Sequence, residues 1–269
     1  MLYIHWNPDP ILIDLGFIAL RWYSLLFAFG IFLCFLYFKK TFQAENLPLE
    51  KLDKLTIYVI VGIVLGARLG HCLFYEFDYY KDHLLEMILP FRFEPEFEFT
   101  GFRGLASHGG AIGILTALIL FSRRHKIGLK FLLDEISVVI PLAGASIRFG
   151  NLMNSEIIGS PTDLPWAFVF ERVDMVPRHP GQLYEALSYL LIFGILWFVK
   201  RKNLKVAPGF RFGLFLVLLF LARFLIEFTK ANQVDFEAGM SLNMGQWLSI
   251  PFILAGAGIM YYFGKAQKQ

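Results

Sequence analysis

The sequence predicts an all-α, polytopic membrane protein with seven transmembrane helices, and three observations support this fold class. The chain of 269 residues is 57% hydrophobic and has a mean hydropathy of +0.56, whereas soluble domains are about 45–50% apolar even when glycine is counted. Its 30 Phe residues are spread over the whole length, as expected for contact with lipid rather than for one dense soluble core. Lysine and arginine gather in alternate connections between the apolar runs.

The apolar runs have the length of membrane spans. A hydrocarbon core about 30 Å thick requires about 20 apolar residues in a helix. The connections 77–106 and 150–181 are the longest, and neither is long enough to form a separate soluble domain. We therefore expect one integral membrane domain over residues 1–269. The seven predicted spans are roughly 15–38, 55–76, 107–123, 129–149, 182–199, 210–229 and 244–264.

The distribution of basic residues predicts the orientation. The connections "KKTFQAENLPLEKLDK", "RRHKIGLK" and "KRKNLKVAPGFR", together with the tail "GKAQKQ", carry 15 Lys and Arg, whereas the opposite side carries seven. Basic connections stay in the cytoplasm. The N-terminus is therefore expected outside and the C-terminus inside, with a small extracytoplasmic region formed by 77–106 and 150–181.

Composition argues against several other classes. The net charge of +3 is small and gives no reason to expect a nucleic-acid partner. Cys34 and Cys72 both lie in apolar runs and form no disulfide framework. No His, Asp, Glu or Cys cluster has the spacing of metal ligands, so we expect neither a metal nor a cofactor.

Polar side chains in the predicted helices collect at one depth. With the orientation above and a rise of about 1.5 Å per residue, nearly all of them fall in the outer half of the membrane. Asp134 and Glu135 are exceptions, predicted near the inner end of a helix, where cytoplasmic water would solvate them. A conducting path would need polar groups through the full thickness. The pattern instead suits a site that a lipid headgroup enters sideways from the outer leaflet. The polar residues at this depth are Arg21, Arg68, His108, Arg148, Asn151, Gln182, Tyr184, Glu185, Arg223 and Glu227.

Individual members of this group have alternative explanations. Arg21 lies close enough to a helix end to extend its charge to the interface. Arg68 is either a lipid-binding residue or a structural partner of Glu76, Glu227 or a backbone carbonyl. Arg148 and Asn151 share one helix face at i and i+3. Because two such groups at the level of Arg223 are hard to explain by packing, we predict that they bind an anion.

The stretch "SHGGAIG" combines a titratable group with bare backbone. His108 opens a predicted helix, and Gly109 and Gly110 follow it directly. Glycine at a helix N-terminus lets an anionic group approach the backbone N–H groups closely, and imidazole titrates near neutral pH. A structural histidine is the alternative. The combination favours a functional site.

Four stretches in this order resemble the prolipoprotein diacylglyceryl transferase family: "SHGGAIG", "RFGNLMNSEIIGSPTDLPWAFVF", "RHPGQLYEAL" and "RFLIEF". The resemblance extends over residues 21–251 and is most specific over 148–186. It implies an enzyme of the bacterial inner membrane whose active site faces the outer leaflet. Such enzymes transfer the sn-1,2-diacylglyceryl group of phosphatidylglycerol to the lipobox cysteine of a prolipoprotein. A thioether forms and glycerol phosphate is released.

The resemblance also implies which residues act. It assigns catalysis to His108, Arg148, Arg223 and Tyr23, and phosphatidylglycerol binding to Arg148, Asn151, Glu156 and Gly159. The bare backbone at the helix start adds Gly109 and Gly110 as lipid-binding candidates, and the depth argument adds Arg68. Two positions depart from the family pattern. Ile147 stands where the family often has glycine, and Leu219 stands where it often has tyrosine. Position 219 therefore offers no phenol to the site.

The expected chemistry follows from the leaving group. As the carbon–oxygen bond breaks, the negative charge of a phosphate monoester develops, and arginines bind phosphate oxygens in a bidentate manner. The attacking thiol must become a thiolate, which needs a base or a positive field. His108 is the candidate base, and Arg148 with Arg223 could lower the pKa of the thiol without it.

Two other functions remain open at this point. A transporter or binding protein for an anionic lipid would use the same arginines, and a membrane scaffold would need no chemistry. Restriction of the polar groups to the outer half argues against a transporter, because a transport path crosses the membrane. The dense cluster of Arg, His and Asn argues against a scaffold.

Overall fold

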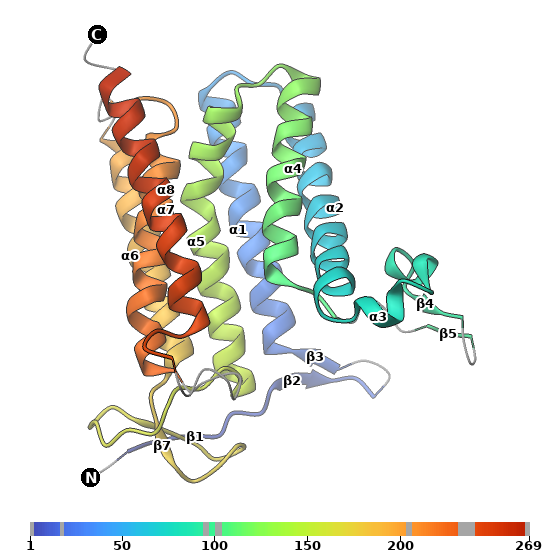
Figure 1. The fold of residues 1–269 in the computed structure, drawn as a ribbon, viewed down its shortest axis with the longest axis vertical. Helices are drawn as coiled ribbons and strands as arrows, with labels where there is room; N and C mark the ends of the chain where they lie inside the picture. Colours follow the sequence, from blue (N-terminus) through green and yellow to red (C-terminus); the bar gives the residue numbers. More distant parts are fainter. Residues whose placement is uncertain are drawn as a thin grey trace. The chain divides into compact units, whose positions relative to one another are not determined.

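A computed structural model describes residues 3–16, 19–93, 97–99, 104–202, 206–230 and 240–266 (Figure 1). These residues are mostly helical and form two compact units. The first unit comprises Met1–Tyr37 and Leu133–Gln269, and the second comprises Phe38–Leu132. A single integral membrane domain over the whole chain stays a prediction.

Six helices in the described part of the chain are long and apolar enough to cross a membrane. The multi-pass membrane class is therefore confirmed. The seventh predicted span, α4 (Ser107–His125), is not among them, and its 19 residues include three basic residues in the last turn. The number seven stays a prediction. The six helices are α1 (Trp22–Ala44), α2 (Leu49–Phe74), α5 (Leu129–Asn154), α6 (Gly181–Arg201), α7 (Phe210–Ile226) and α8 (Met244–Ala266).

Two helix boundaries differ from the prediction in ways that affect function. The first helix begins at Trp22 rather than near residue 15, because β2 (Ile11–Asp14) and β3 (Ala19–Arg21) pair as an antiparallel hairpin. Helix α5 continues to Asn154 rather than ending near residue 149. The polar residues of "RFGNLMN" therefore all lie on the last two turns of this helix.

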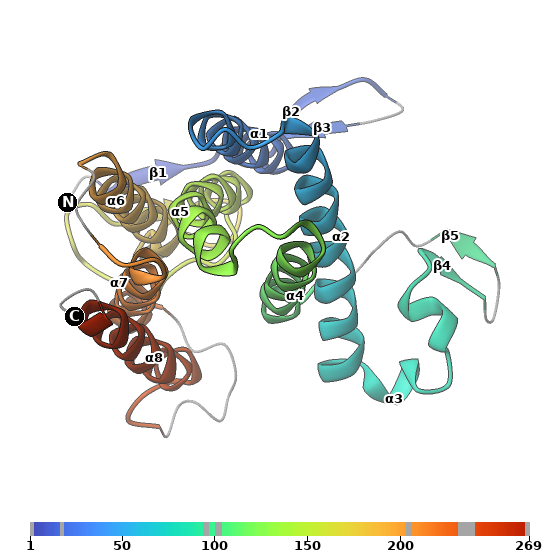
Figure 2. The same cartoon turned by 90° about the horizontal axis from the view of Figure 1, so that it is seen from above.

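In the first unit, α7 packs against both α6 and α8 (Figures 1 and 2). A core of Val138, Ile192, Leu196 and Phe215 joins α5, α6 and α7. Because lipid tails are as apolar as these side chains, close packing rather than removal from water stabilises this core. The 3-10 helix η2 (Glu227–Thr229) follows α7 directly in the chain.

A small sheet holds the connection between α5 and α6. Strand β1 (Ile4–Trp6) runs parallel to β6 (Phe168–Phe170), which pairs antiparallel with β7 (Pro177–Arg178). The indole of Trp6 donates a hydrogen bond of 2.8 Å to the carbonyl oxygen of Leu152 on α5. The sheet thus fixes residues 155–180 against the end of α5.

The acidic pair on α5 corrects one expectation. Asp134 and Glu135 are only 3% and 2% exposed, so the prediction that water solvates them was wrong. Asp134 accepts hydrogen bonds from the backbone N–H groups of Gly209 (2.7 Å) and Phe212 (2.9 Å). A carboxylate at the first turn of a helix satisfies free N–H groups and the helix dipole. Asp134 therefore caps α7 from a neighbouring helix.

Glu135 takes part in the same buried network. Its carboxylate accepts hydrogen bonds from the Tyr37 hydroxyl at 2.7 Å, from Lys200 Nζ at 2.5 Å and from Arg211 Nη2 at 2.8 Å. A buried carboxylate is tolerated when its oxygens are paired in this way. The network links α1, α5, α6 and α7 at one end of the unit.

In the second unit, α2 and α4 meet along a seam of glycines (Figure 2). A Cβ atom on Gly109 would overlap the carbonyl oxygen of Gly66, and one on Gly113 would overlap that of Gly62. Small residues allow membrane helices to approach this closely. The other elements of this unit are α3 (Phe77–Tyr80), the 3-10 helix η1 (Leu84–Met87), and the antiparallel pair β4 (Phe91–Arg92) and β5 (Glu98–Phe99).

Candidate active site

The end of α5 brings three predicted binding residues together in the first unit. Arg148 Nη1 donates a hydrogen bond to Asn151 Oδ1 at 3.2 Å. Asn151 Nδ2 donates to Glu156 Oε2 at 3.0 Å, and Asn154 Nδ2 donates to Glu156 Oε1 at 3.1 Å. Both oxygens of the Glu156 carboxylate are therefore held by amide groups of the preceding helix.

A strained turn places Glu156 in this position. Ser155 and Ile157, which flank it, both have φ of +56°. Left-handed backbone is uncommon outside glycine, and for a β-branched residue it is an outlier that costs roughly 1–3 kcal/mol. The Glu156 N–H donates to the Asn151 carbonyl oxygen at 3.0 Å, so the chain turns back on the helix that it leaves. This strained backbone directs the Glu156 carboxylate at the side-chain amides of Asn151 and Asn154.

An ion pair from α6 fixes the other side of Arg148. Arg148 Nε lies 2.6 Å from Glu185 Oε2, and the Glu185 side chain is 1% exposed. Lys230 Nζ lies 3.0 Å from Glu185 Oε1 and 3.3 Å from Glu227 Oε2. Alternating charges offset the desolvation cost that each would have alone. The guanidinium of Arg148 is thus oriented by both Glu185 and Asn151.

Arg223 contributes a second guanidinium on α7. Its side chain has no hydrogen bond or ion pair with any residue that the structure describes. The phenol of Tyr189 on α6 lies within electrostatic reach of both Arg148 and Arg223. The Tyr189 ring lies against the backbone of α5, where a Cβ on Gly144 would be 2.9 Å from its Cδ2 atom. One phenol therefore lies near both predicted catalytic arginines.

Tyr23 joins the site from the start of α1. Its ring packs on the α5 backbone, and a Cβ on Gly150 would lie 2.8 Å from Tyr23 Cδ2 and 3.2 Å from Tyr23 Cα. Its phenol is within electrostatic reach of both Glu156 and Arg148. The first unit thus gathers five of the predicted residues: Tyr23, Arg148, Asn151, Glu156 and Arg223.

Gly159 has a packing reason of its own. Its N–H donates to the His179 carbonyl oxygen at 2.9 Å, and it pairs with Lys230 in an isolated β-bridge. A Cβ atom here would lie 2.6 Å from the carbonyl oxygens of His179 and Thr229. The close approach requires glycine and brings Lys230 to Glu185 and Glu227. Direct contact of Gly159 with lipid stays a prediction.

An ion pair outside the helices stabilises the connection between α5 and α6, to which Gly159 belongs. Arg178 donates to the Asp174 carboxylate through Nε at 3.1 Å and through Nη2 at 2.6 Å. These hydrogen bonds hold the pKa of Asp174 below its ordinary value. Arg178 Nη1 also donates to the Gly159 carbonyl oxygen at 3.4 Å.

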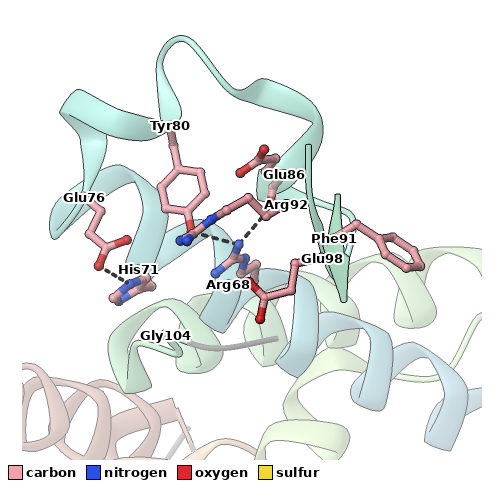
Figure 3. Close-up of a pocket in the computed structure, with 9 residues that line it drawn as sticks. All are labelled: Arg68, His71, Glu76, Tyr80, Glu86, Phe91, Arg92, Glu98 and Gly104. Atoms are coloured by element: carbon pink, nitrogen blue, oxygen red, sulfur yellow. Dashed lines mark hydrogen bonds and ion pairs between the residues drawn. The ribbon is translucent and has the colours of Figure 1, made fainter. Parts of the chain in front are cut away.

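Arg68 lies in the second unit and is engaged by the segment that follows α2. It is 4% exposed, and its Nη2 donates to the Tyr80 hydroxyl at 3.0 Å and to the Glu86 carbonyl oxygen at 2.7 Å (Figure 3). The guanidinium also lies 4.9 Å from the centre of the Tyr80 ring. A backbone carbonyl was one of its predicted structural partners, and this contact is confirmed. Its lipid-binding role stays a prediction.

The surroundings of Arg68 form a polar cavity of about 290 Å³. Its walls carry both signs of charge (Figure 3). Glu76 faces His71, at 3.5 Å between Oε1 and Nε2. The cavity is lined by Arg68, His71, Glu76, Tyr80, Glu86, Phe91, Arg92, Glu98 and Gly104.

His108 is also in the second unit. It is the second residue of α4 and is exposed, and its imidazole has no hydrogen-bond partner among the described residues. Gly109 and Gly110 beside it are buried, and Gly109 packs on Gly66. This contact explains Gly109 without a ligand. The predicted roles of His108, Gly109 and Gly110 toward substrate stay predictions.

Comparison with known proteins identifies the family. The model of the prolipoprotein diacylglyceryl transferase family matches residues 10–262. The chain belongs to this family. A phosphatidylglycerol–prolipoprotein diacylglyceryl transferase of Bacteroides fragilis is 49% identical over 98% of this chain and 97% of its own length. Proteins of the same name from Tolumonas auensis and Chloroherpeton thalassium are 47% and 46% identical, over 97% and 96% of this chain and 98% and 94% of theirs. The resemblance inferred from sequence is confirmed.

The structure bears on one departure from the transferase family pattern. Leu219 packs around the same core cluster as Tyr189. Tyr189 on α6 therefore places a phenol near both arginines, although position 219 on α7 has none. Sequence reasoning missed Tyr189 because it lies in an apolar run. The available signal was its i+4 spacing from Glu185, which puts both on one helix face.

Proposed function

We propose that this protein transfers the sn-1,2-diacylglyceryl group of phosphatidylglycerol to the thiol of a lipobox cysteine. The observation that supports this best is the pair Arg148 and Arg223, which lie within electrostatic reach of one phenol, that of Tyr189. Arg148 is oriented by Glu185 and Asn151, and Arg223 has no carboxylate partner among the described residues. A site with one preoriented and one unpaired guanidinium suits a phosphate.

The leaving group explains why two guanidinium groups are needed. The thiolate sulfur attacks the glycerol carbon, a carbon–sulfur bond forms, and the carbon–oxygen bond to phosphate breaks. Charge then develops on the oxygen of glycerol phosphate. Preorganised donors aimed at such a charge act strongly in a site of low dielectric. In this reaction Arg148 and Arg223 bind the phosphate, while Asn151 and Glu156 maintain the orientation of Arg148.

The thiol loses its proton before attack. His108 is the proposed base, because imidazole is the side chain most often used for this task near neutral pH. Tyr23 and Tyr189 border the arginines and contribute hydrogen-bonding groups. The positive field of Arg148 and Arg223 also favours the thiolate over the thiol.

The proposed setting is the bacterial cytoplasmic membrane, crossed seven times with α4 as the additional span. The N-terminus and the connection 150–181 face outward, and the C-terminus is cytoplasmic. The excess of basic residues on the opposite side supports this orientation.

Cysteine labelling tests the orientation. We expect Asp163→Cys to react with an impermeant thiol reagent in intact spheroplasts and Glu45→Cys to react only after lysis, because both positions are exposed but belong to opposite sides. Position 159 is unsuitable, since Gly159 tolerates no side chain. The parent protein, with Cys34 and Cys72, is the labelling control. The reverse pattern would contradict the orientation.

A reconstituted assay tests the activity. Purified protein with phosphatidylglycerol and a lipobox peptide should increase the mass of the peptide by one diacylglyceryl group. A transporter or lipid-binding protein would bind or move phosphatidylglycerol and leave the peptide unchanged. Mass spectrometry of the peptide separates these outcomes.

A further inference from the structure

Several buried oxygen atoms around Glu156 lack hydrogen-bond partners. Among the described residues, none donates to Asn154 Oδ1, Ser155 Oγ, Gln182 Oε1 or Glu185 Oε2. Glu185 Oε2 is engaged in the ion pair with Arg148, which leaves three oxygens. Buried polar groups are almost always paired, so a cluster of exceptions calls for a specific explanation.

The two amide oxygens cannot be reassigned as nitrogens. Gln182 Nε2 donates to the Glu156 carbonyl oxygen at 2.6 Å, and Asn154 Nδ2 donates to the Glu156 carboxylate at 3.1 Å. Flipping either amide would place oxygen against oxygen. The other end of each amide is therefore an acceptor, and Gln182 is fully buried.

The oxygens of Asn154, Ser155 and Gln182 therefore need hydrogen-bond donors from outside this group, because both amide nitrogens are already bonded to Glu156. It adjoins the proposed phosphate site, because Glu156 is bonded to Asn151, which is bonded to Arg148. A positively charged donor is disfavoured beside Arg148 and Lys230. Neutral hydroxyl groups fit the chemistry, since each donates one hydrogen bond and still accepts another.

We propose that the oxygens of Asn154, Ser155 and Gln182 bind the hydroxyl groups of the headgroup glycerol and so select phosphatidylglycerol among phosphodiester lipids. This inference rests on the proposed function and specifies how its lipid is chosen. Phosphate binds at the arginines, and the glycerol beyond it lies toward Glu156. A site built to bind a hydroxyl discriminates strongly against an analogue without it, because its polar groups are then left unpaired.

The test compares two lipids that differ only in the headgroup. Phosphatidylpropanol keeps the acyl chains and the phosphodiester of phosphatidylglycerol and lacks both headgroup hydroxyls. We expect the wild-type protein to favour phosphatidylglycerol by at least about 10-fold in kcat/KM for transfer to a lipobox peptide. Ser155→Ala should reduce this ratio about threefold and Gln182→Met about tenfold, through lower rates with phosphatidylglycerol.

A matched control and a second variant keep the result interpretable. Gln246 is also a buried glutamine, but both ends of its amide are bonded: Oε1 accepts from the Asn243 N–H, and Nε2 donates to the Phe224 carbonyl oxygen on α7. Gln246→Met should leave the lipid ratio unchanged. Ser155→Ala removes one oxygen and no bond to Glu156, so it tests the proposal even if Gln182→Met fails to fold.

Three results would overturn the proposal. Equal losses with both lipids would show that these residues only support Glu156. An unchanged lipid ratio with a raised KM for the peptide would show that the oxygens accept from peptide N–H groups. Transfer by wild type without headgroup discrimination would reject this inference alone, whereas absence of any transfer from phosphatidylglycerol would reject the proposed function.

Discussion

Arg148→Lys is expected to lower the rate of diacylglyceryl transfer by about 10²–10³-fold, although the charge is kept. Arg148 uses Nε for Glu185 and Nη1 for Asn151 at the same time. A single ammonium cannot reproduce this planar fork and still face a phosphate. The measurement is kcat at saturating phosphatidylglycerol, with the amount of membrane-inserted protein determined in parallel.

Arg21→Lys serves as the control for this prediction. Arg21 is exposed on β3, outside the described contacts of the site, and its replacement should leave the rate unchanged. Arg223→Ala should lower the rate of diacylglyceryl transfer by about the same factor as Arg148→Lys. Wild-type turnover in both variants of the arginine pair would rule out phosphate binding by this pair.

His108→Gln is expected to slow transfer by at least about two orders of magnitude, since a general base contributes roughly 10²–10⁴-fold. It should also remove an ionisation from the acidic limb of the pH–rate profile, because the base acts only when unprotonated. Binding of phosphatidylglycerol should be largely intact, since a neutral imidazole contributes little to holding an anion. Steady-state rates across pH, with lipid binding measured separately, provide the test.

Two other outcomes would assign His108 differently. Weaker lipid binding with the maximal rate preserved at saturating lipid would make it a headgroup ligand at the start of α4. A normal rate with an unchanged pH profile would remove it from the reaction. Activation of the thiol would then depend on the field of Arg148 and Arg223.

The membrane helices were predictable because a run of about 20 apolar residues is a local signal. The start of α1 was not, since the residues before Trp22 are apolar enough for a span and pair instead as a hairpin. The end of α5 was also missed. Its last turns are polar, and their amides and guanidinium are stabilised by Glu156 and Glu185, which lie later in the sequence.

The residues that form the site could be predicted, but most of the contacts between them could not. Spacing on one helix predicted the proximity of Arg148 and Asn151, and their hydrogen bond agrees with it. The ion pair with Glu185 depends on how α5 and α6 pack, which a single sequence does not specify. The left-handed backbone at Ile157 gives no local signal, because β-branched residues rarely adopt it.

The expected surroundings of Asp134 and Glu135 were wrong for a related reason. Depth along the helix placed them near the inner surface, where water was expected to solvate them. Backbone N–H groups of α7, and side chains that include Lys200 and Arg211, surround them instead. Burial of a charge depends on partners from other helices, and depth alone does not identify those partners.

The most direct test of the account is to determine which bond of phosphatidylglycerol breaks. The lipid is prepared with a heavy oxygen isotope at the ester oxygen between the diacylglycerol carbon and phosphorus, and incubated with protein and a lipobox peptide. If Arg148 and Arg223 stabilise a departing phosphate, the heavy oxygen will appear in the released glycerol phosphate, and the peptide will carry a thioether without it. Heavy oxygen retained on the diacylglyceryl fragment, with cleavage between oxygen and phosphorus, would contradict the account.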